Sequence, residues 1–303
     1  MRYCTAQLVC NGFGTAGGVA PSKVDAMTID VWIQHPTRRF LSFEMFASLL
    51  RWTGGQIPDE DPPLEATIAS MDAAGVDLAL LTAWRGPHGH DLISNDQVVQ
   101  WVRRYPTRFA GVATVDLDRP MQAVRELRRR VRDDGFVGLR LLPWLWNAAP
   151  TDRRYYPLYA ECVELGVPFC TQVGHTGPLR PSETGRPIPY IDQVAIDLPE
   201  LTIVCGHVGY PWTEEMIAVA RKHENVYIDT SAYTTRRLPA ELVAFMKTNT
   251  GSRKVLFGSN FPMIGHSHCL EGIGELGLSE DTLAAYLQGN ALRVFTALQG
   301  RGA

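Results

Sequence analysis

The sequence predicts a single (β/α)8 TIM barrel, an α/β fold, and three observations support that prediction. Apolar runs alternate with amphipathic segments along most of the chain, which is typical of βα units on a parallel sheet. Eight apolar runs can be identified, and eight βα units close a barrel more readily than they form an open sheet. The length of 303 residues is also that of a barrel built as one domain.

The predicted strands are short apolar runs, because strands buried on both faces of a parallel sheet have few polar positions. In chain order they span residues 27–33, 76–83, 109–115, 136–141, 168–173, 201–206, 226–229 and 254–257. Helices are expected at residues 64–74, 93–105, 121–133, 155–165, 190–197, 213–223, 239–249, 281–288 and 291–298. Residues 40–63 form an expected insertion after the first strand. We expect residues 1–26 to be a loosely ordered extension and residues 27–303 to be the barrel domain.

The composition argues against several kinds of partner. A net charge of −3 and basic residues spread along the chain argue against nucleic acid, which needs a concentrated basic face. The short arginine run at 128–130 is expected on the exposed face of a helix. No apolar stretch approaches the ~20 residues that span a bilayer. The six cysteines form no CxxC pair and are expected to be buried thiols of a cytoplasmic protein. We expect a small-molecule partner, and a monomer and a homo-oligomer are both compatible with the sequence.

A TIM barrel carries its chemistry at the carboxyl ends of its strands, where the loops surround the open mouth. Two predicted strand ends carry a glycine-flanked histidine, His175 and His207. Their matched positions in neighbouring βα units predict a shared site. Other polar or aromatic side chains at predicted strand ends are Trp32, Gln34, Trp84, Arg140, Asp229 and Asn260.

Five ordered motifs resemble the amidohydrolase-related family, which contains metal-dependent hydrolases and non-oxidative decarboxylases of carboxylated aromatic or dienoic compounds. The motifs lie at residues 175–178, 201–212, 225–231, 256–262 and 289–293. The resemblance extends over residues 27 to about 298. It implies an enzyme on a TIM barrel without identifying a substrate.

The resemblance also implies where a metal would be held. In such a family a His-x-His ends the first strand, histidines follow strands five and six, and an aspartate ends strand eight, which together hold a divalent metal. This sequence keeps the two middle positions as His175 and His207. It has Trp32 and Gln34 in place of the His-x-His and Asn260 in place of the aspartate.

These replacements predict that no metal or other cofactor is tightly bound. An indole cannot ligate a metal, and a carboxamide is a weak ligand beside imidazole. If zinc or another divalent ion does bind, His175 and His207 are its expected ligands. His35 would need a bulge to face the mouth, because alternate strand residues face opposite ways. A direct role for His88 and His90, on the loop after the second strand, is a further alternative.

The main hypothesis is a metal-independent enzyme that hydrolyses or decarboxylates a small carboxylated cyclic or aromatic compound. His175 and His207 are expected to act as general acid and base, because imidazole transfers protons near pH 7. Asn260 is expected to donate a hydrogen bond to a developing oxyanion. Isomerisation or dehydration by proton transfer also fits these groups.

The remaining candidate residues are expected to bind the substrate. Gln34 is a second hydrogen-bond donor, and Arg140 is a candidate anchor for a carboxylate through paired hydrogen bonds. Trp32 and Trp84 are expected to line the binding site. Two alternatives stay open, namely a metal-dependent hydrolase or carboxy-lyase with an atypical site, and a catalytically inactive barrel that binds a small molecule or a protein.

Overall fold

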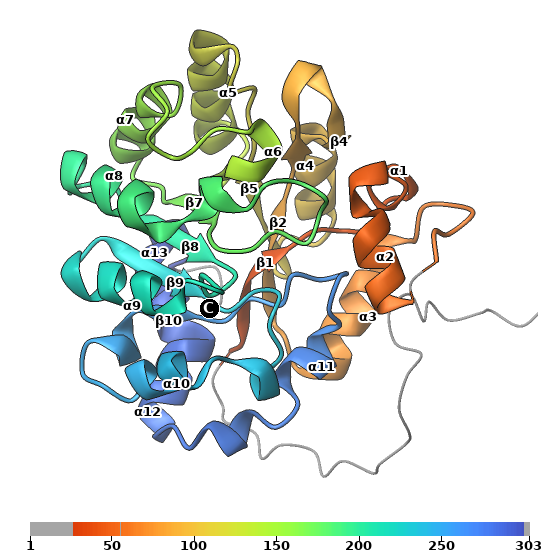
Figure 1. Cartoon of the computed structure of the whole chain (residues 1–303). Helices are drawn as coiled ribbons and strands as arrows, with labels where there is room; N and C mark the ends of the chain where they lie inside the picture. The colour runs from red at the N-terminus through yellow and green to blue at the C-terminus, as the bar shows by residue number, and fades with distance from the viewer. Residues whose placement is uncertain (1–26, 55, 300–303) are drawn as a thin grey trace, which may run out of the picture.

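Eight parallel strands form the central sheet of the computed structural model, which describes residues 27–54 and 56–299 (Figure 1). Their order, β1-β2-β5-β6-β7-β8-β9-β10, and their parallel pairing confirm the predicted TIM barrel. The strands are β1 (Ile29–Ile33), β2 (Leu78–Thr82), β5 (Phe109–Ala113), β6 (Gly138–Arg140), β7 (Phe169–Gln172), β8 (Ile203–Gly206), β9 (Val226–Asp229) and β10 (Val255–Leu256). Each lies within the apolar run that predicted it.

Backbone hydrogen bonds close the barrel between its first and last strands. The N–H of Val31 donates to the carbonyl oxygen of Phe257 at 3.0 Å, and the N–H of Asn260 donates to that of Trp32 at 2.9 Å. The parallel register of β1 against β2 shifts between Asp30 and Ile33. The carboxyl end of β1 therefore meets the segment after β10, which brings the two together at the mouth.

Helices surround the strands at the predicted places (Figure 1). The helix α4 begins at a capping box, in which Ser94 and Gln97 satisfy each other's backbone N–H groups. The helices that match predictions are α3 (Leu64–Ala74), α4 (Asn95–Arg104), α5 (Pro120–Arg132), α7 (Tyr156–Leu165), α8 (Asp192–Asp197), α9 (Thr213–Lys222), α10 (Ala240–Met246), α12 (Glu280–Ala284) and α13 (Asn290–Val294).

Several short elements lie in segments where no element was predicted. The insertion after β1 contains α1 (Arg38–Leu41) and α2 (Ala47–Thr53), and a hairpin of β3 (Trp84–Arg85) and β4 (Asp91–Ile93) follows β2. Two more helices, α6 (Pro143–Trp146) and α11 (His266–Leu270), lie in loops after β6 and β10. These elements all belong to loops on the mouth side, where tertiary contacts outweigh weak local preferences.

The strands and helices pack into buried apolar clusters. One cluster joins Val31, Leu80, Val112 and Leu256 of the strands to helix α13. A larger cluster packs the sheet against the other helices. The four cysteines in the described part of the chain are buried, as expected.

Of the arginine run on α5, Arg128 and Arg129 are exposed as expected, and Arg130 corrects the expectation. Arg130 is only 4% exposed and forms ion pairs with Asp96, Glu126 and Asp134. Its apolar stem is covered while its guanidinium is fully paired, so this arginine belongs to the packing between α4 and α5 instead of to a wet face. None of the described helices is long and apolar enough to cross a membrane. The predicted extension at residues 1–26 lies outside the described residues.

Candidate active site

The predicted site residues come together at the mouth, here the end of the barrel formed by the carboxyl ends of its strands. The ring of Trp32 lies 4.9 Å from the ring of His207, between centroids. The guanidinium carbon of Arg140 lies 3.6 Å from the Trp32 ring. His175 contacts the loop after β8 through its N–H, which donates to the carbonyl oxygen of Tyr210. Residues far apart in sequence thus share one end of the barrel, as predicted.

All four predicted substrate-binding residues, Trp32, Gln34, Trp84 and Arg140, are buried, and Trp32 and Arg140 are closed off inside the barrel. Trp32 is 1% exposed, and a Cβ added to Gly206 would stand 2.5 Å from its ring. Arg140 is 2% exposed and donates to Thr82 Oγ1 and, at 2.9 Å, to the carbonyl oxygen of Val31. In this structure both side chains fill the barrel axis, and neither faces solvent.

Gln34, Trp84 and Asn260 form a hydrogen-bonded group where the barrel closes. Gln34 Nε2 donates to the carbonyl oxygen of Phe261 at 2.6 Å and to Asn260 Oδ1 at 3.2 Å. Its Oε1 accepts from Trp84 Nε1 at 3.3 Å, and Gln34 has no exposed surface. Asn260 is partly exposed, and its amide nitrogen has no hydrogen bond within the protein in the described structure. Of these three residues, Asn260 alone offers a donor to the mouth.

The donor set at these positions does not fit a divalent metal. Trp32 offers an indole N–H, and the amide groups of Gln34 and Asn260 already bond to each other. The Arg140 guanidinium places a fixed positive charge against the Trp32 ring. This charge would repel a divalent metal ion bound at the same place. Among the residues that the structure describes, no three or more His, Cys, Asp or Glu side chains are grouped as ligands.

The other histidines do not replace the missing ligands. His35 is 3% exposed, its Nδ1 bonds to Thr67 Oγ1 at 2.8 Å, and its Nε2 bonds to the carbonyl oxygen of Pro62 at 3.0 Å. The irregularity in β1 therefore does not turn His35 to the mouth. His88 and His90 are exposed on the β3–β4 hairpin.

His207 is held in a strained turn after β8. Its φ is 69°, and that of the β-branched Val208 is 54°, in the left-handed region that such residues rarely adopt. Ala232, after β9, and Asn260, after β10, also have positive φ, at 67° and 66°. Strained backbone of this kind is typical of sites where the surrounding fold fixes a functional geometry.

Ser231, which was not among the predicted site residues, hydrogen bonds to His207 and orients it. Its Oγ lies 2.7 Å from His207 Nδ1, and its own N–H donates to Asp229 Oδ1 at 2.8 Å. Asp229 thus acts on the histidine through Ser231. Burial lowers the pKa of His207 to about 3, with further contributions from Arg140 and His175. A neutral His207 can donate or accept a hydrogen bond, but this pKa argues against the expectation that it exchanges protons near pH 7.

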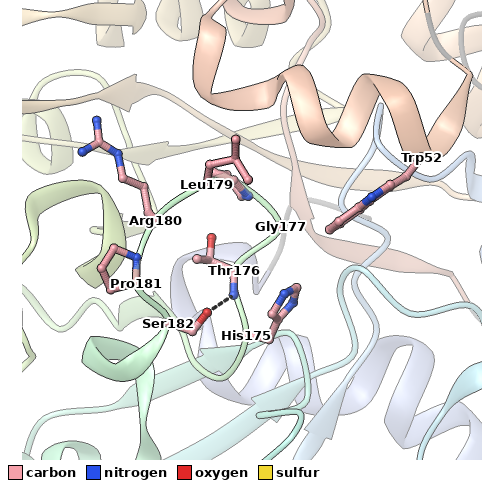
Figure 2. A pocket seen from close by; sticks show the side chains of 9 residues that line it. Trp52, His175, Thr176, Gly177, Leu179, Arg180, Pro181 and Ser182 are labelled. Carbon is pink, nitrogen blue, oxygen red and sulfur yellow. Dashed lines mark hydrogen bonds between the residues drawn. The ribbon is translucent and has the colours of Figure 1, made fainter.

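His175 is exposed and lies on the wall of an open pocket of about 500 Å³ (Figure 2). The pocket is formed by the segment 175–182 after β7, here called the pocket loop, together with Trp52 of α2. Gln172 fixes the start of the loop, because its Nε2 donates to the carbonyl oxygen of His175 and its Oε1 accepts from Trp144 Nε1. Trp52 was not predicted, since nothing in the insertion sequence places it near His175.

A second buried group lies behind the closure of the barrel. Asp30 Oδ1 accepts from the N–H groups of Trp32 and Ser259 at 3.0 and 3.1 Å. Asp30 Oδ2 has no hydrogen bond and lies 3.6 Å from Nε2 of the buried His266. Burial raises the pKa of Asp30 to about 7 and lowers that of His266 to about 3. This group fixes the β1–β10 closure and does not line the pocket.

The TIM barrel with His175 and His207 at neighbouring strand ends fits the amidohydrolase family, and comparison with known proteins agrees. The family model for amidohydrolases matches residues 52–296, and this chain belongs to that family. The gamma-resorcylate decarboxylase of Polaromonas sp. (strain JS666) is 25% identical, over 67% of this chain and 74% of that protein. The 2-keto-4-carboxy-3-hexenedioate hydratase of Sphingobium sp. (strain NBRC 103272 / SYK-6) is 27% identical, over 68% and 71%. The chain is thus related to enzymes, among them a decarboxylase and a hydratase.

Solved structures share the fold. An uncharacterised TIM-barrel protein from Bordetella bronchiseptica, Bb4693, has a TM-score of 0.77 and 26% identity, with 90% of this chain and 99% of that chain covered. The 5-carboxyvanillate decarboxylase of Novosphingobium aromaticivorans has a TM-score of 0.63 and 19% identity, with 89% and 96% covered. That decarboxylase was solved with manganese and 4-hydroxy-3-methoxy-5-nitrobenzoic acid. At this identity the likeness concerns the fold alone.

Proposed function

We propose that this protein decarboxylates a small hydroxylated aromatic carboxylate without a metal, using His175 for proton transfer. The observation that carries the proposal is the contrast at the mouth. Trp32, Gln34 and Asn260 stand where the family resemblance places metal ligands, whereas His175 is kept on an open pocket. The relationship to a decarboxylase supports the reaction class.

The proposed chemistry is the transfer of one proton followed by the loss of carbon dioxide. Protonated His175 gives its proton to the ring carbon that bears the carboxylate. The bond between that carbon and the carboxylate then breaks, carbon dioxide leaves, and the bonding electrons restore the aromatic ring. His175 is reprotonated from solvent, which reaches it because its side chain is exposed.

Two other groups at the mouth are proposed to stabilise the charge that develops on the substrate. The free amide nitrogen of Asn260 donates a hydrogen bond to a substrate oxygen, while Gln34 holds the amide in that orientation. Neutral His207 donates a second hydrogen bond if Ser231 donates to its Nδ1. The buried Arg140 contributes a fixed positive charge beneath Trp32, in place of a direct contact with the carboxylate.

Metal independence is the part of the proposal that the relatives challenge most directly, because a fold neighbour holds manganese. We expect purified protein to contain far less than one zinc, manganese or iron per chain by elemental analysis. Incubation with EDTA should leave turnover unchanged, since zinc sites normally use at least three protein ligands. A stoichiometric metal whose removal abolishes turnover would overturn metal independence and favour the atypical metal site.

Addition of water to an unsaturated carboxylate is a second candidate function, supported by the relationship to the hydratase. It needs the same proton transfer from His175 to carbon, with water as the second reactant. Hydrolysis of a small lactone also uses a proton-transfer residue and an oxyanion donor, so it is included in the same test.

A substrate panel tests these functions. Hydroxylated benzoates, dienoic acids and lactones are incubated with the protein, and the products are analysed by mass spectrometry for loss of carbon dioxide or gain of water. Loss of carbon dioxide from a hydroxybenzoate supports the proposal, and gain of water supports the second candidate. No turnover of any compound, together with retained binding, would favour an inactive barrel that serves as a binding protein.

A further inference from the structure

Trp52 is an unusually exposed aromatic side chain in a defined position. It lies on α2, and 64% of its surface is exposed, although large aromatic side chains normally bury most of theirs. Together with Leu179, which is 72% exposed, it supplies apolar surface to the pocket that contains His175. Exposed apolar surface at a pocket is typical of ligand contact.

The position of Trp52 is fixed by contacts between α2 and the pocket loop. Ser48 Oγ donates to the carbonyl oxygen of Gly177 at 2.8 Å. A Cβ added to Gly177 would stand 2.5 Å from Leu49 Cδ2 and 3.6 Å from the Trp52 ring, so α2 and the pocket loop are in close contact here. In Figure 1 the loop after β7 extends toward α2, in agreement with these contacts. The insertion after β1 therefore delivers Trp52 to the wall of the pocket.

The rings of Trp52 and His175 are nearly parallel, at 24°, with centroids 6.5 Å apart (Figure 2). A planar ligand that stacks on one ring is thus held nearly parallel to the other. Arg180, by contrast, extends away from both rings in Figure 2. The geometry favours recognition of a flat ring over pairing with a charge.

We propose that Trp52 is the specificity-determining residue of this site and selects planar, aromatic carboxylates by stacking on their rings. The inference rests on the proposed function for the site and adds the shape of the substrate and the residue that recognises it. Stacking on Trp52 places the aromatic ring of the substrate beside the imidazole of His175. The imidazole is the group that must transfer a proton to a carbon of that ring. Trp52 itself moves no proton.

Binding of a matched pair of ligands tests the inference without any turnover. By isothermal titration calorimetry on the full chain, 2,6-dihydroxybenzoate and benzoate are compared with cyclohexanecarboxylate, which has a similar size and charge but a puckered ring. We expect wild-type protein to prefer the planar acids. The variant Trp52→Leu should weaken their binding by about 3- to 10-fold, as expected for a lost aromatic pair, and leave cyclohexanecarboxylate nearly unchanged.

Two further variants serve as controls. Trp52→Phe keeps an aromatic face and should retain most of the preference for planar acids. Met121→Ala removes an apolar side chain that is 61% exposed on α5 and does not line the pocket, so it should behave as wild type. Absence of a planar preference in wild type, or its persistence in Trp52→Leu, overturns the inference.

These measurements distinguish a failure of the inference about Trp52 from a failure of the proposed function. If Trp52→Leu loses the planar preference although no carboxylate is turned over, the inference holds and the proposed function fails. If an aromatic carboxylate is turned over and Trp52→Leu leaves both its KM and the planar preference unchanged, the proposed function holds and the inference fails. When both hold, Trp52→Leu raises KM for the aromatic substrate more than it lowers kcat.

Discussion

The two sides of the barrel mouth differ in what they do with polar groups. On the β1–β10 side, Trp32, Gln34 and Asp30 are buried. The Trp32 backbone carbonyl, Gln34 Nε2 and Asp30 Oδ1 bond to the segment after β10, so these atoms serve the closure of the barrel. On the β7–β8 side, His175 is exposed on a pocket, and His207 is partly exposed in a strained turn.

This difference shows that strand ends of one barrel can serve either packing or ligand contact. On the β1–β10 side, Trp32 and Gln34 stand where the family resemblance places metal ligands, and in this structure they contribute packing and hydrogen bonds. The other side kept its imidazoles and a loop that can contact a ligand. Chemistry is therefore expected on the β7–β8 side and stability on the β1–β10 side, and substitutions can test this division.

The largest expected effect is on turnover at His175. His175→Ala should lower kcat/KM on a confirmed substrate by about 10²- to 10⁴-fold, the usual contribution of a proton-transfer residue. Because the side chain is exposed, the free energy of unfolding should change by only about 0.5 kcal/mol. Steady-state kinetics and chemical denaturation check the two values. Unchanged kcat/KM would show that the β7–β8 side is not the reactive one.

Trp32→Ala should show the opposite pattern. Removal of a fully buried tryptophan leaves a cavity and should lower the free energy of unfolding by about 3–5 kcal/mol. Urea denaturation measures this loss, and Trp32→Phe, which keeps most of the volume, is the matched control. A loss below about 1 kcal/mol would mean that Trp32 is not part of the packing that closes the barrel.

Asp30→Asn tests the buried closure through its pH dependence. The folded pKa of Asp30 is raised to about 7 from an ordinary value of 3.8, so the folded protein binds this proton more tightly than the unfolded chain does. Its stabilising contribution is complete below about pH 4 and is lost as the pH rises to about 7. Asparagine can still accept both backbone N–H groups at Oδ1 and does not ionise.

The variant should therefore gain stability relative to wild type between pH 4 and pH 7. The gain is expected to be roughly 1–4 kcal/mol, where the upper value converts the whole pKa shift. Chemical denaturation of both proteins across this pH range gives the difference. A difference that stays constant with pH would show that Asp30 ionises as freely in the folded protein as in the unfolded chain.

The smallest expected effect is at Ser231. Ser231→Ala removes the hydrogen bond to His207 Nδ1, which is worth about 0.5–1.5 kcal/mol, so kcat should fall by about 2- to 10-fold. Ser231→Thr, which keeps the hydroxyl, should restore most of the loss. If both variants lower kcat equally, the hydroxyl does not orient His207.

The sequence by itself determined the barrel and the location of the mouth. Eight apolar runs are enough to place the strands, because strands buried on both faces carry a strong compositional signal. The parallel arrangement then requires His175, His207 and Asn260 to share one end, whatever their separation along the chain. The replacement of the expected ligands by Trp32 and Gln34 is likewise visible in the sequence alone.

Tertiary structure alone decided which of these residues face solvent. The sequence placed Trp32, Gln34, Trp84 and Arg140 at strand ends, but a strand end can face the barrel axis, the closure or the pocket. Hydrogen bonds between distant segments, such as those of Gln34 with Asn260, settled that choice. Trp52 lies at the pocket because α2 packs against the loop after β7, where Ser48 Oγ donates to the carbonyl oxygen of Gly177. Such contacts join segments more than a hundred residues apart, and no local pattern in the sequence encodes them.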